Sequence, residues 1–192
     1  MTQNDTKELI LDEARKVFAR FGFKKATMDE IANATDKAKS SIYHYFASKE
    51  TIFQKVVEKE GLELNIELLR AIESENTPQR KISAYIITKI QVLHNLKNYY
   101  SALRDEYLER YGFIGRLRKR HEKEEFRIIQ DILISMNEGG DAIALDIETT
   151  SFAIVTALKG LEYHWAKMVD ICKIEGCIDK IVDTLFYGIV KR

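Results

Sequence analysis

Residues 39–50 spell KSSIYHYFASKE, and the conformation of this stretch decides the fold of the N-terminal region. A strand fits in part, because isoleucine, tyrosine and phenylalanine suit a pleated, half-buried surface. At helical spacing, Ile42 and Phe46 lie one turn apart on one face, and polar residues spread around the other. The flanking sequence decides between the two conformations.

The sequence before this stretch predicts two helices. An apolar stripe marks the first, and Gly22 followed by Phe23 is expected to end it as a left-handed cap. Thr27, with Glu30 three residues later, predicts a capping box at the start of a short second helix. The apolar stripe of the first helix consists of Ile10, Ala14, Val17, Phe18 and Phe21.

The stretch itself is then expected to hold a third helix and the start of a fourth. A turn containing Thr35 and Asp36 leads into the third helix over residues 38–46, and Ser48 is expected to cap a fourth running to residue 72. Two short helices joined by a tight turn form a helix-turn-helix, whose second helix enters the DNA major groove. The flanking pattern therefore favours the helical conformation.

The predicted recognition helix has a core face and a DNA face. Its apolar residues Ile42 and Phe46 are expected to pack on Phe18, Phe21 and Ile31. The side chains expected to face the duplex are Lys39, Ser40, Ser41, Tyr43 and His44.

The charge of this region favours phosphate. Residues 37–49 contain three lysines and no carboxylate, so we expect an unopposed positive patch. The N-terminus of the fourth helix, with Lys49 beside it, is a further favourable place for a phosphate oxygen.

Residues 9–55 resemble the DNA-binding region of the tetracycline-repressor (TetR) family of bacterial transcription regulators. Where that family has a turn glycine, an apolar residue and a serine cap, this chain has Asp36, Lys37 and Ala38. The resemblance rests on Ala14, Phe18, Gly22, Phe23, Thr27, Ile31, Ala32 and the run IYHYFASKETIF.

The resemblance implies a role for each matching position. It implies contacts to the DNA backbone from Thr27, Tyr43, His44 and Lys49. The residues that it places nearest the base edges are Lys39, Ser40 and Ser41.

Composition sets the fold class of the whole chain. Its 192 residues contain one proline and nine glycines, and long runs of good helix formers predict an all-α fold of about nine helices. We expect a helix-turn-helix DNA-binding domain over residues 1–47. Residues 48–192 are expected to form a larger helical domain, which the resemblance assigns to ligand binding and dimerisation. No segment looks like a signal peptide or membrane span, so we expect a cytoplasmic protein.

The last two predicted helices suggest a dimer. A helix beginning at Asp146 carries small residues at a spacing that lets another helix approach closely, and a final helix is expected from Cys177. We predict a four-helix bundle formed with a second copy of the chain, the alternative being an intramolecular core. The residues predicted at this interface are Ala153, Ala157, Gly160, Ile181, Leu185 and Phe186.

Aromatic residues concentrate in the middle of the chain, where they either line an apolar ligand pocket or belong to the core. Our candidate pocket residues are His94, Tyr107, Phe152, His164 and Trp165.

Motifs for catalysis, cofactors or metals are absent from the sequence. It contains no glycine-rich phosphate loop, no H-E-x-x-H and no G-x-S-x-G, so we predict neither an enzyme nor a cofactor. His121 lies four residues before Glu125, but the surrounding alternation of charges favours a solvated helix face over a metal site. Cys172 and Cys177 are expected to be buried, inert thiols.

The sequence thus predicts a homodimeric regulator that binds an inverted-repeat operator and is released by an unknown small molecule. Two alternatives remain open. One is a helical protein-interaction module without DNA binding, and the other is a thiol- or metal-responsive regulator that uses Cys172 and Cys177.

Overall fold

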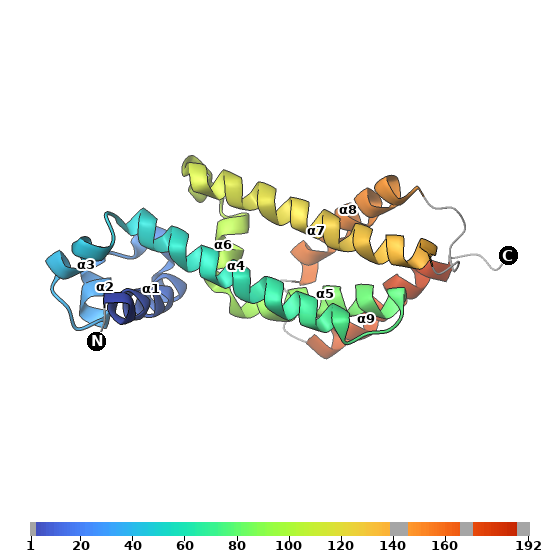
Figure 1. Cartoon of the computed structure of the whole chain (residues 1–192), viewed down its shortest axis with the longest axis horizontal. Helices are drawn as coiled ribbons and strands as arrows, with labels where there is room; N and C mark the ends of the chain where they lie inside the picture. Colours follow the sequence, from blue (N-terminus) through green and yellow to red (C-terminus); the bar gives the residue numbers. More distant parts are fainter. Residues whose placement is uncertain (1–2, 139–145, 166–170, 188–192) are drawn as a thin grey trace. The chain divides into compact units, whose positions relative to one another are not determined.

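A computed structural model gives the fold and describes residues 3–138, 146–165 and 171–187 (Figure 1). Within these ranges, the side chains at 137–138, 161–165, 171–175 and 185–187 are not described. Over the described ranges all regular structure is helical, which confirms the predicted all-α class. The elements are α1 (Gln3–Lys25), α2 (Met28–Ala34), α3 (Lys39–Tyr45), α4 (Lys49–Glu73), α5 (Pro78–Asn95), α6 (Lys97–Arg104), the 3-10 helix η1 (Glu106–Arg110), α7 (Gly112–Glu138), α8 (Ile147–Trp165) and α9 (Ile171–Tyr187).

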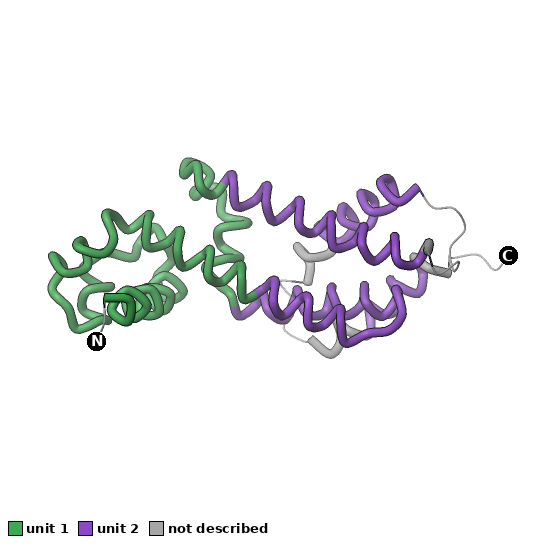
Figure 2. The backbone as a smooth tube through the Cα atoms, viewed as in Figure 1, with its two compact units in different colours: residues 1–63, 96–114 green, residues 64–95, 115–192 purple. Residues whose placement is uncertain are grey.

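The helices group into two compact units (Figure 2). Unit 1 comprises residues 1–63 and 96–114, and unit 2 comprises residues 64–95 and 115–192. Helix α4 is therefore shared, because its first part belongs to unit 1 and its second part to unit 2. The functional boundary predicted after residue 47 stays a prediction.

Unit 1 has a core of stacked aromatic rings. The ring centroid of Phe53 lies 5.1 Å from that of Phe18 and 4.7 Å from that of Phe23. Ile42 and Phe46 are both buried, as the helical interpretation of residues 39–50 requires. The recognition helix is therefore anchored from one face, which leaves its other face available.

Phe21 was expected in this core, and that prediction is wrong, because its side chain is 38% exposed. The next residue, Gly22, has a φ of 75° and a ψ of 156°, which break the helical path inside α1. After this kink Phe23 turns inward, and the helix resumes to Lys25 instead of ending near Gly22 as predicted. A positive φ of this kind favours glycine.

Unit 2 is held together mainly by aliphatic residues. Helix α5 packs along α9 and also contacts α8. Helix α9 begins at Ile171, six residues before the predicted start at Cys177, because Gly176 alone does not end a helix. The buried residues of these three helices include Ile82, Ile86, Leu93, Ile154, Leu158, Ile178 and Val182.

Candidate nucleic-acid interface

Short-range hydrogen bonds cap the start of α2, and a left-handed residue forms the turn that follows it. The backbone N–H of Glu30 donates to the Thr27 hydroxyl at 3.2 Å, and the Thr27 N–H donates to the Glu30 carboxylate at 2.7 Å. These two bonds confirm the predicted capping box. Asp36 then adopts a φ of 52°, so it takes the left-handed conformation of a turn glycine.

The outer face of α3 carries the side chains predicted to meet DNA. Lys39, Ser40, Tyr43 and His44 are exposed, and Ser41 is half-buried. Thr27, at the start of α2, is also exposed. The structure thus presents hydroxyl, imidazole and ammonium groups from one anchored helix, a set able to bond phosphate oxygens and base edges.

Lys49 makes contacts within unit 1 that the sequence did not predict. Its ammonium Nζ donates to the backbone carbonyl oxygens of Phe23 and Ala26, each at 2.8 Å, and lies 4.6 Å from the centroid of the Phe23 ring. The side chain therefore ties α4 to the α1–α2 junction just before Thr27. Lys49 positions the N-terminus of α2, and a phosphate contact by its remaining N–H stays a prediction.

Lys39 is paired in the structure. Its Nζ lies 2.8 Å from the Oδ2 of Asp29, which belongs to the first turn of α2. The hydrogen bond that Lys39 donates to the Asp29 carboxylate raises the pKa of Lys39. The expectation of an unopposed positive patch is wrong here, because the fold brings in a carboxylate from outside residues 37–49.

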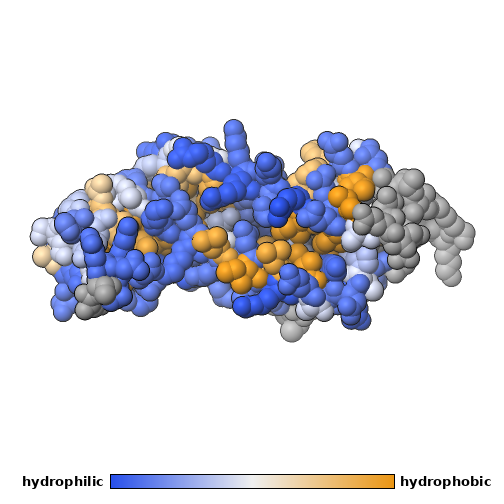
Figure 3. Space-filling view, viewed as in Figure 1, coloured by the Kyte–Doolittle hydropathy of each residue, from blue (hydrophilic) through white to orange (hydrophobic). Residues whose placement is uncertain are grey.

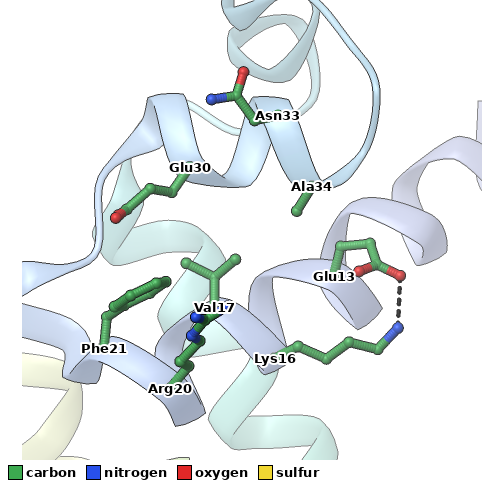
Figure 4. A pocket seen from close by; sticks show the side chains of 8 residues that line it. All are labelled: Glu13, Lys16, Val17, Arg20, Phe21, Glu30, Asn33 and Ala34. Carbon is green, nitrogen blue, oxygen red and sulfur yellow. Dashed lines mark hydrogen bonds and ion pairs between the residues drawn. The ribbon is translucent and has the colours of Figure 1, made fainter.

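A groove of about 300 Å³ runs between α1 and α2 in unit 1 (Figure 4). The guanidinium of Arg20 lies 5.0 Å from the centroid of the exposed Phe21 ring, and Lys16 pairs with Glu13 at 2.7 Å. The groove contains none of the predicted DNA contacts. Its lining residues are Glu13, Lys16, Val17, Arg20, Phe21, Glu30, Asn33 and Ala34.

A buried carboxylate, Glu60 of α4, joins three helices of unit 1. It accepts hydrogen bonds from Arg15 Nε of α1 at 3.0 Å, from Asn98 Nδ2 of α6 at 2.8 Å and from the Tyr99 backbone N–H at 2.7 Å. Leu96, which precedes α6, provides no side-chain cap, so Glu60 acts as a cap supplied by another helix. Burial raises the pKa of Glu60, although Asn98, Tyr99 and Arg15 oppose this rise.

Two further contacts complete this junction. Arg15 also bonds both carboxylate oxygens of Glu63, each at 2.8 Å. A Cβ on Gly61 would lie only 2.6 Å from the Tyr99 ring, so α6 approaches α4 more closely than a side chain would allow. Together these contacts hold α1, α4 and α6 in fixed positions relative to one another within unit 1, which also contains the helix-turn-helix.

Unit 2 contains a polar cluster that the sequence prediction missed. The Glu125 carboxylate of α7 accepts hydrogen bonds from the Lys89 ammonium and, at 2.9 Å, from the Tyr85 hydroxyl, both on α5. His121 Nε2 lies 3.6 Å from the same carboxylate. The predicted solvated face is thus wrong for His121 and Glu125, because their side chains are 14% and 6% exposed.

The ionisation of this cluster follows from its burial. Burial opposes the charge of Glu125, but the Lys89 ammonium, His121 and the hydrogen bonds from Lys89 and Tyr85 together outweigh burial and lower the pKa of that carboxyl. Burial lowers the pKa of His121 to about 4, with Lys89 and Lys159 adding to the effect and Glu125 opposing it. At neutral pH the cluster therefore holds an ion pair beside a neutral imidazole.

The predicted pocket residues are scattered. His94 is exposed at the end of α5, and Phe152 of α8 is 66% exposed. Tyr107 belongs to unit 1, where Arg110 and Lys24 lie over its ring, with 3.9 Å and 4.9 Å to the centroid. The side chains of His164 and Trp165 lie outside the described residues.

The predicted interface residues are partly visible. Ala153, Ala157 and Gly160 are exposed on α8, and Ile181 of α9 is half-buried. The side chains of Leu185 and Phe186 lie outside the described residues.

The two cysteines differ in what the structure describes. Cys177 is exposed, so the expectation of a buried thiol is wrong for this residue, which faces outward from α9. The side chain of Cys172 lies outside the described residues. Among the described residues, no group of three or more His, Cys, Asp or Glu side chains is placed to hold a metal ion.

Apolar surface is also exposed on α4. Leu62, Ile66 and Leu69 follow one another at intervals of four and three residues, so they form a stripe along one side of the helix. Figure 3 shows patches of hydrophobic surface among the mostly hydrophilic residues. None of the helices in the described ranges is both long and apolar enough to cross a membrane.

Comparison with curated proteins identifies the N-terminal segment. Residues 10–56 match the family model of bacterial regulatory proteins, tetR family. The HTH-type transcriptional regulator YhgD of Bacillus subtilis is 42% identical over 52 residues, which cover 27% of this chain and 27% of YhgD. The chain spans about a quarter to about a half of the length of the curated relatives it matches.

Solved structures resemble the chain over nearly its full length. The regulator FadR from Bacillus subtilis, in complex with stearoyl-CoA, has a TM-score of 0.72 at 21% identity, covering 95% of this chain and 99% of FadR. AibR, in complex with isovaleryl coenzyme A and operator DNA, has a TM-score of 0.69 at 16% identity, covering 94% of this chain and 98% of AibR. These identities show a shared fold alone. The match to the tetR family of bacterial regulatory proteins thus covers residues 10–56, which hold the helix-turn-helix, and beyond that segment the likeness is one of fold.

Proposed function

We propose that the protein is a DNA-binding transcriptional regulator, a repressor that acts as a homodimer on an inverted-repeat operator and is released by a small effector. The observation that carries the proposal is the exposed polar face of α3. The capping box of Thr27 and Glu30 and the buried anchors Ile42 and Phe46 hold that face in place. The predicted DNA contacts are Thr27, Lys39, Ser40, Ser41, Tyr43, His44 and Lys49.

The test uses the purified protein and DNA from its own promoter region. Tyr43→Ala and His44→Ala are each expected to weaken binding roughly 5- to 30-fold, because a dimer loses one polar contact per subunit at about 1 kcal/mol each. His94→Ala is the matched control, since His94 is equally exposed but lies outside α3. Wild-type affinity of both α3 variants would contradict this placement.

Operator geometry provides a second test. A two-fold dimer imposes an inverted repeat whose half-site centres lie about 34 to 36 Å apart, or a multiple of that distance. Affinity is expected to fall steeply with salt, because lysine contacts to phosphate release counterions. A footprint over a single unrepeated half-site would argue against the dimeric arrangement.

The homodimer is proposed to form through α8 and α9. Support comes from the exposed small residues Ala153, Ala157 and Gly160, which let a partner helix approach closely. Ala157→Glu is expected to leave the chain folded but to shift it from dimer to monomer, as light scattering would show. Lys180→Glu, at an exposed position on α9, serves as the control for an added carboxylate.

The effector is proposed to bind within unit 2, and an acyl-coenzyme A thioester is the first class to test. Support comes from the fold shared with FadR and AibR, whose structures hold stearoyl-CoA and isovaleryl coenzyme A. By linkage, an effector that lowers DNA affinity must itself bind more weakly to the DNA complex, by the same factor. Titration of stearoyl-CoA and isovaleryl-CoA into the protein–DNA complex tests this class, with free coenzyme A as the control.

Two further expectations accompany the proposal. We expect no catalytic activity, because the similar proteins are regulators, and we expect the protein to act in the cytoplasm. A pure protein-interaction module is the alternative, and it predicts that no promoter fragment is bound at moderate salt.

A further inference from the structure

The contact between Asp29 and Lys39 joins the two helices of the helix-turn-helix across their exposed N-terminal turns. Lys39 is the first residue of α3, and Asp29 is the second of α2. The Lys39 Nζ and the Asp29 Oδ2 are 2.8 Å apart, and both side chains are solvent-exposed. Lys39 is also among the residues proposed to meet DNA.

The second carboxylate in the first turn of α2 has a different task. Glu30 forms the capping box with Thr27, so its oxygens already accept the Thr27 N–H and lie 3.0 Å from the Thr27 hydroxyl. Asp29 takes no part in that box, and its carboxylate instead accepts a hydrogen bond from Lys39 on α3. A carboxylate in this first turn also stabilises the positive N-terminal end of α2, so Asp29 has that role in addition to its contact with Lys39.

The pair changes the charge that the surface offers to DNA. Of the three lysines in residues 37–49, Lys49 donates to two backbone carbonyls and Lys39 is neutralised by Asp29. A phosphate that approaches Lys39 has to replace the Asp29 carboxylate as its partner. Once released, that carboxylate faces the negative duplex, where like charges repel.

We propose that Asp29 sets the affinity of the protein for DNA, by holding Lys39 in the free protein and so weakening every complex in which Lys39 contacts phosphate. The inference rests on the proposed DNA-binding function. Asp29 is a positioning residue that acts through Lys39 and does not itself contact DNA. Its presence keeps binding weak and reversible, which favours release from non-operator sequences.

The experiment compares the wild type with Asp29→Asn, using fluorescence anisotropy with operator DNA over a series of salt concentrations. The substitution keeps the shape of the side chain and removes its charge. Exposed ion pairs are individually weak, so freeing two copies per dimer is expected to tighten binding roughly 2- to 25-fold at low salt. The salt slope is expected to steepen by up to about 2, because each released lysine displaces about one more counterion.

Two further variants separate the proposed route from general electrostatics. Asp12→Asn is the matched control, because Asp12 is an exposed aspartate paired with Lys59 at 2.8 Å within unit 1. It removes the same charge and is expected to leave the salt slope unchanged. In a Lys39→Ala background, Asp29→Asn is expected to lose most of its effect. Thermal melting of every variant checks that the fold is retained.

The outcomes are distinguishable. If the wild type binds its operator and Asp29→Asn binds with the same affinity and slope, Asp29 does not set affinity and this inference is wrong while the proposed function stands. If Asp29→Asn tightens binding equally in the Lys39→Ala background, the route through Lys39 is wrong. If neither wild type nor Asp29→Asn binds any promoter fragment, the proposed function fails and the inference fails with it.

Discussion

Two buried carboxylates, Glu60 in unit 1 and Glu125 in unit 2, have pKa values shifted in opposite directions, although burial raises both. Both residues are almost inaccessible to solvent, with 1% of Glu60 and 5% of Glu125 exposed when backbone and side chain are counted together. Yet the pKa of Glu60 is raised, mainly by burial, whereas that of Glu125 is lowered because Lys89, His121 and Tyr85 together outweigh burial, with the Lys89 ammonium the largest of these causes. The same residue type at the same depth therefore ionises differently.

The two pKa shifts differ because the positively charged partners of the two carboxylates differ in their exposure to solvent. Arg15, the partner of Glu60, is partly exposed and also pairs with Glu63. Water therefore screens its charge, and a second carboxylate shares it. Lys89 is itself only 2% exposed, so its charge acts on Glu125 with little screening. Glu60 is thus held largely by hydrogen bonds, and Glu125 by a buried ion pair.

Lys89→Met is expected to have the largest effect on this comparison. It leaves the Glu125 carboxylate buried without its counter-charge, so the free energy of unfolding should fall by about 3 to 5 kcal/mol. Urea unfolding at pH 7, followed by circular dichroism, measures the loss. The double variant Lys89→Met/Glu125→Met, which removes both charges, should recover most of it, and a single variant as stable as wild type would show that the pair is not buried.

His121 should make the stability of unit 2 depend on pH. Its pKa of about 4 in the folded protein lies below the ordinary value of 6.5, so the folded state favours neutral imidazole. Stability from this source is complete above pH 6.5 and is lost as pH falls through about 4, amounting to about 3 kcal/mol.

Unfolding of wild type and His121→Asn at pH 7 and pH 4 measures this contribution of His121 to the free energy of unfolding. The difference in unfolding free energy between them should shift against the wild type at the lower pH. His44→Asn is the control, because it makes the same replacement at an exposed position on α3.

Glu60→Gln should have a smaller effect, of about 1 kcal/mol at pH 7, because the amide oxygen can still accept the Tyr99 N–H. The sign of its pH dependence sharpens the comparison. The raised pKa of Glu60 means that the folded state gains stability below the unfolded pKa and loses it as pH rises through the folded value.

The two carboxylates are therefore expected to differ in direction. As pH falls from 7 to 4, the advantage of wild type over Glu60→Gln should grow, whereas its advantage over Glu125→Gln should shrink. Unfolding of both variants at the two pH values provides the measurement. Parallel trends would show that Arg15 and Lys89 act alike.

Local sequence patterns explain why unit 1 was predictable. The spacing of Thr27 and Glu30, and of Ile42 and Phe46, specifies capping and burial within a single helix. The all-α class follows from composition in the same way. Lys39 and Lys49 were placed on the correct helices, but their partners Asp29, Phe23 and Ala26 lie on other elements, which a local pattern does not reveal.

The sequence pattern indicates the buried polar cluster of unit 2 less clearly. The run RLRKRHEKEEF is charged at most positions, which hides the direction each side chain takes. Extended to its neighbours, however, α7 has inward-facing residues at intervals of three or four, and His121 and Glu125 occupy two of those positions. The series is Ile114, Leu117, His121, Glu125, Ile128 and Ile132. Periodicity thus marked the burial of Glu125, but its pairing with Lys89 depends on how α5 packs against α7.

The contact of Asn98 with both Arg15 and Glu60 limits how freely residues 10–56 can be exchanged for the matching segment of another protein. Asn98 lies 83 residues from Arg15 in sequence, yet its amide also donates to the Arg15 carbonyl at 3.1 Å. The segment that matches the family, residues 10–56, includes Arg15 but ends before Glu60. A chimera joined at that border would set a foreign residue 15 against this chain's own Glu60, so a working hybrid requires arginine at that position or a graft that carries α4 and α6 along with it.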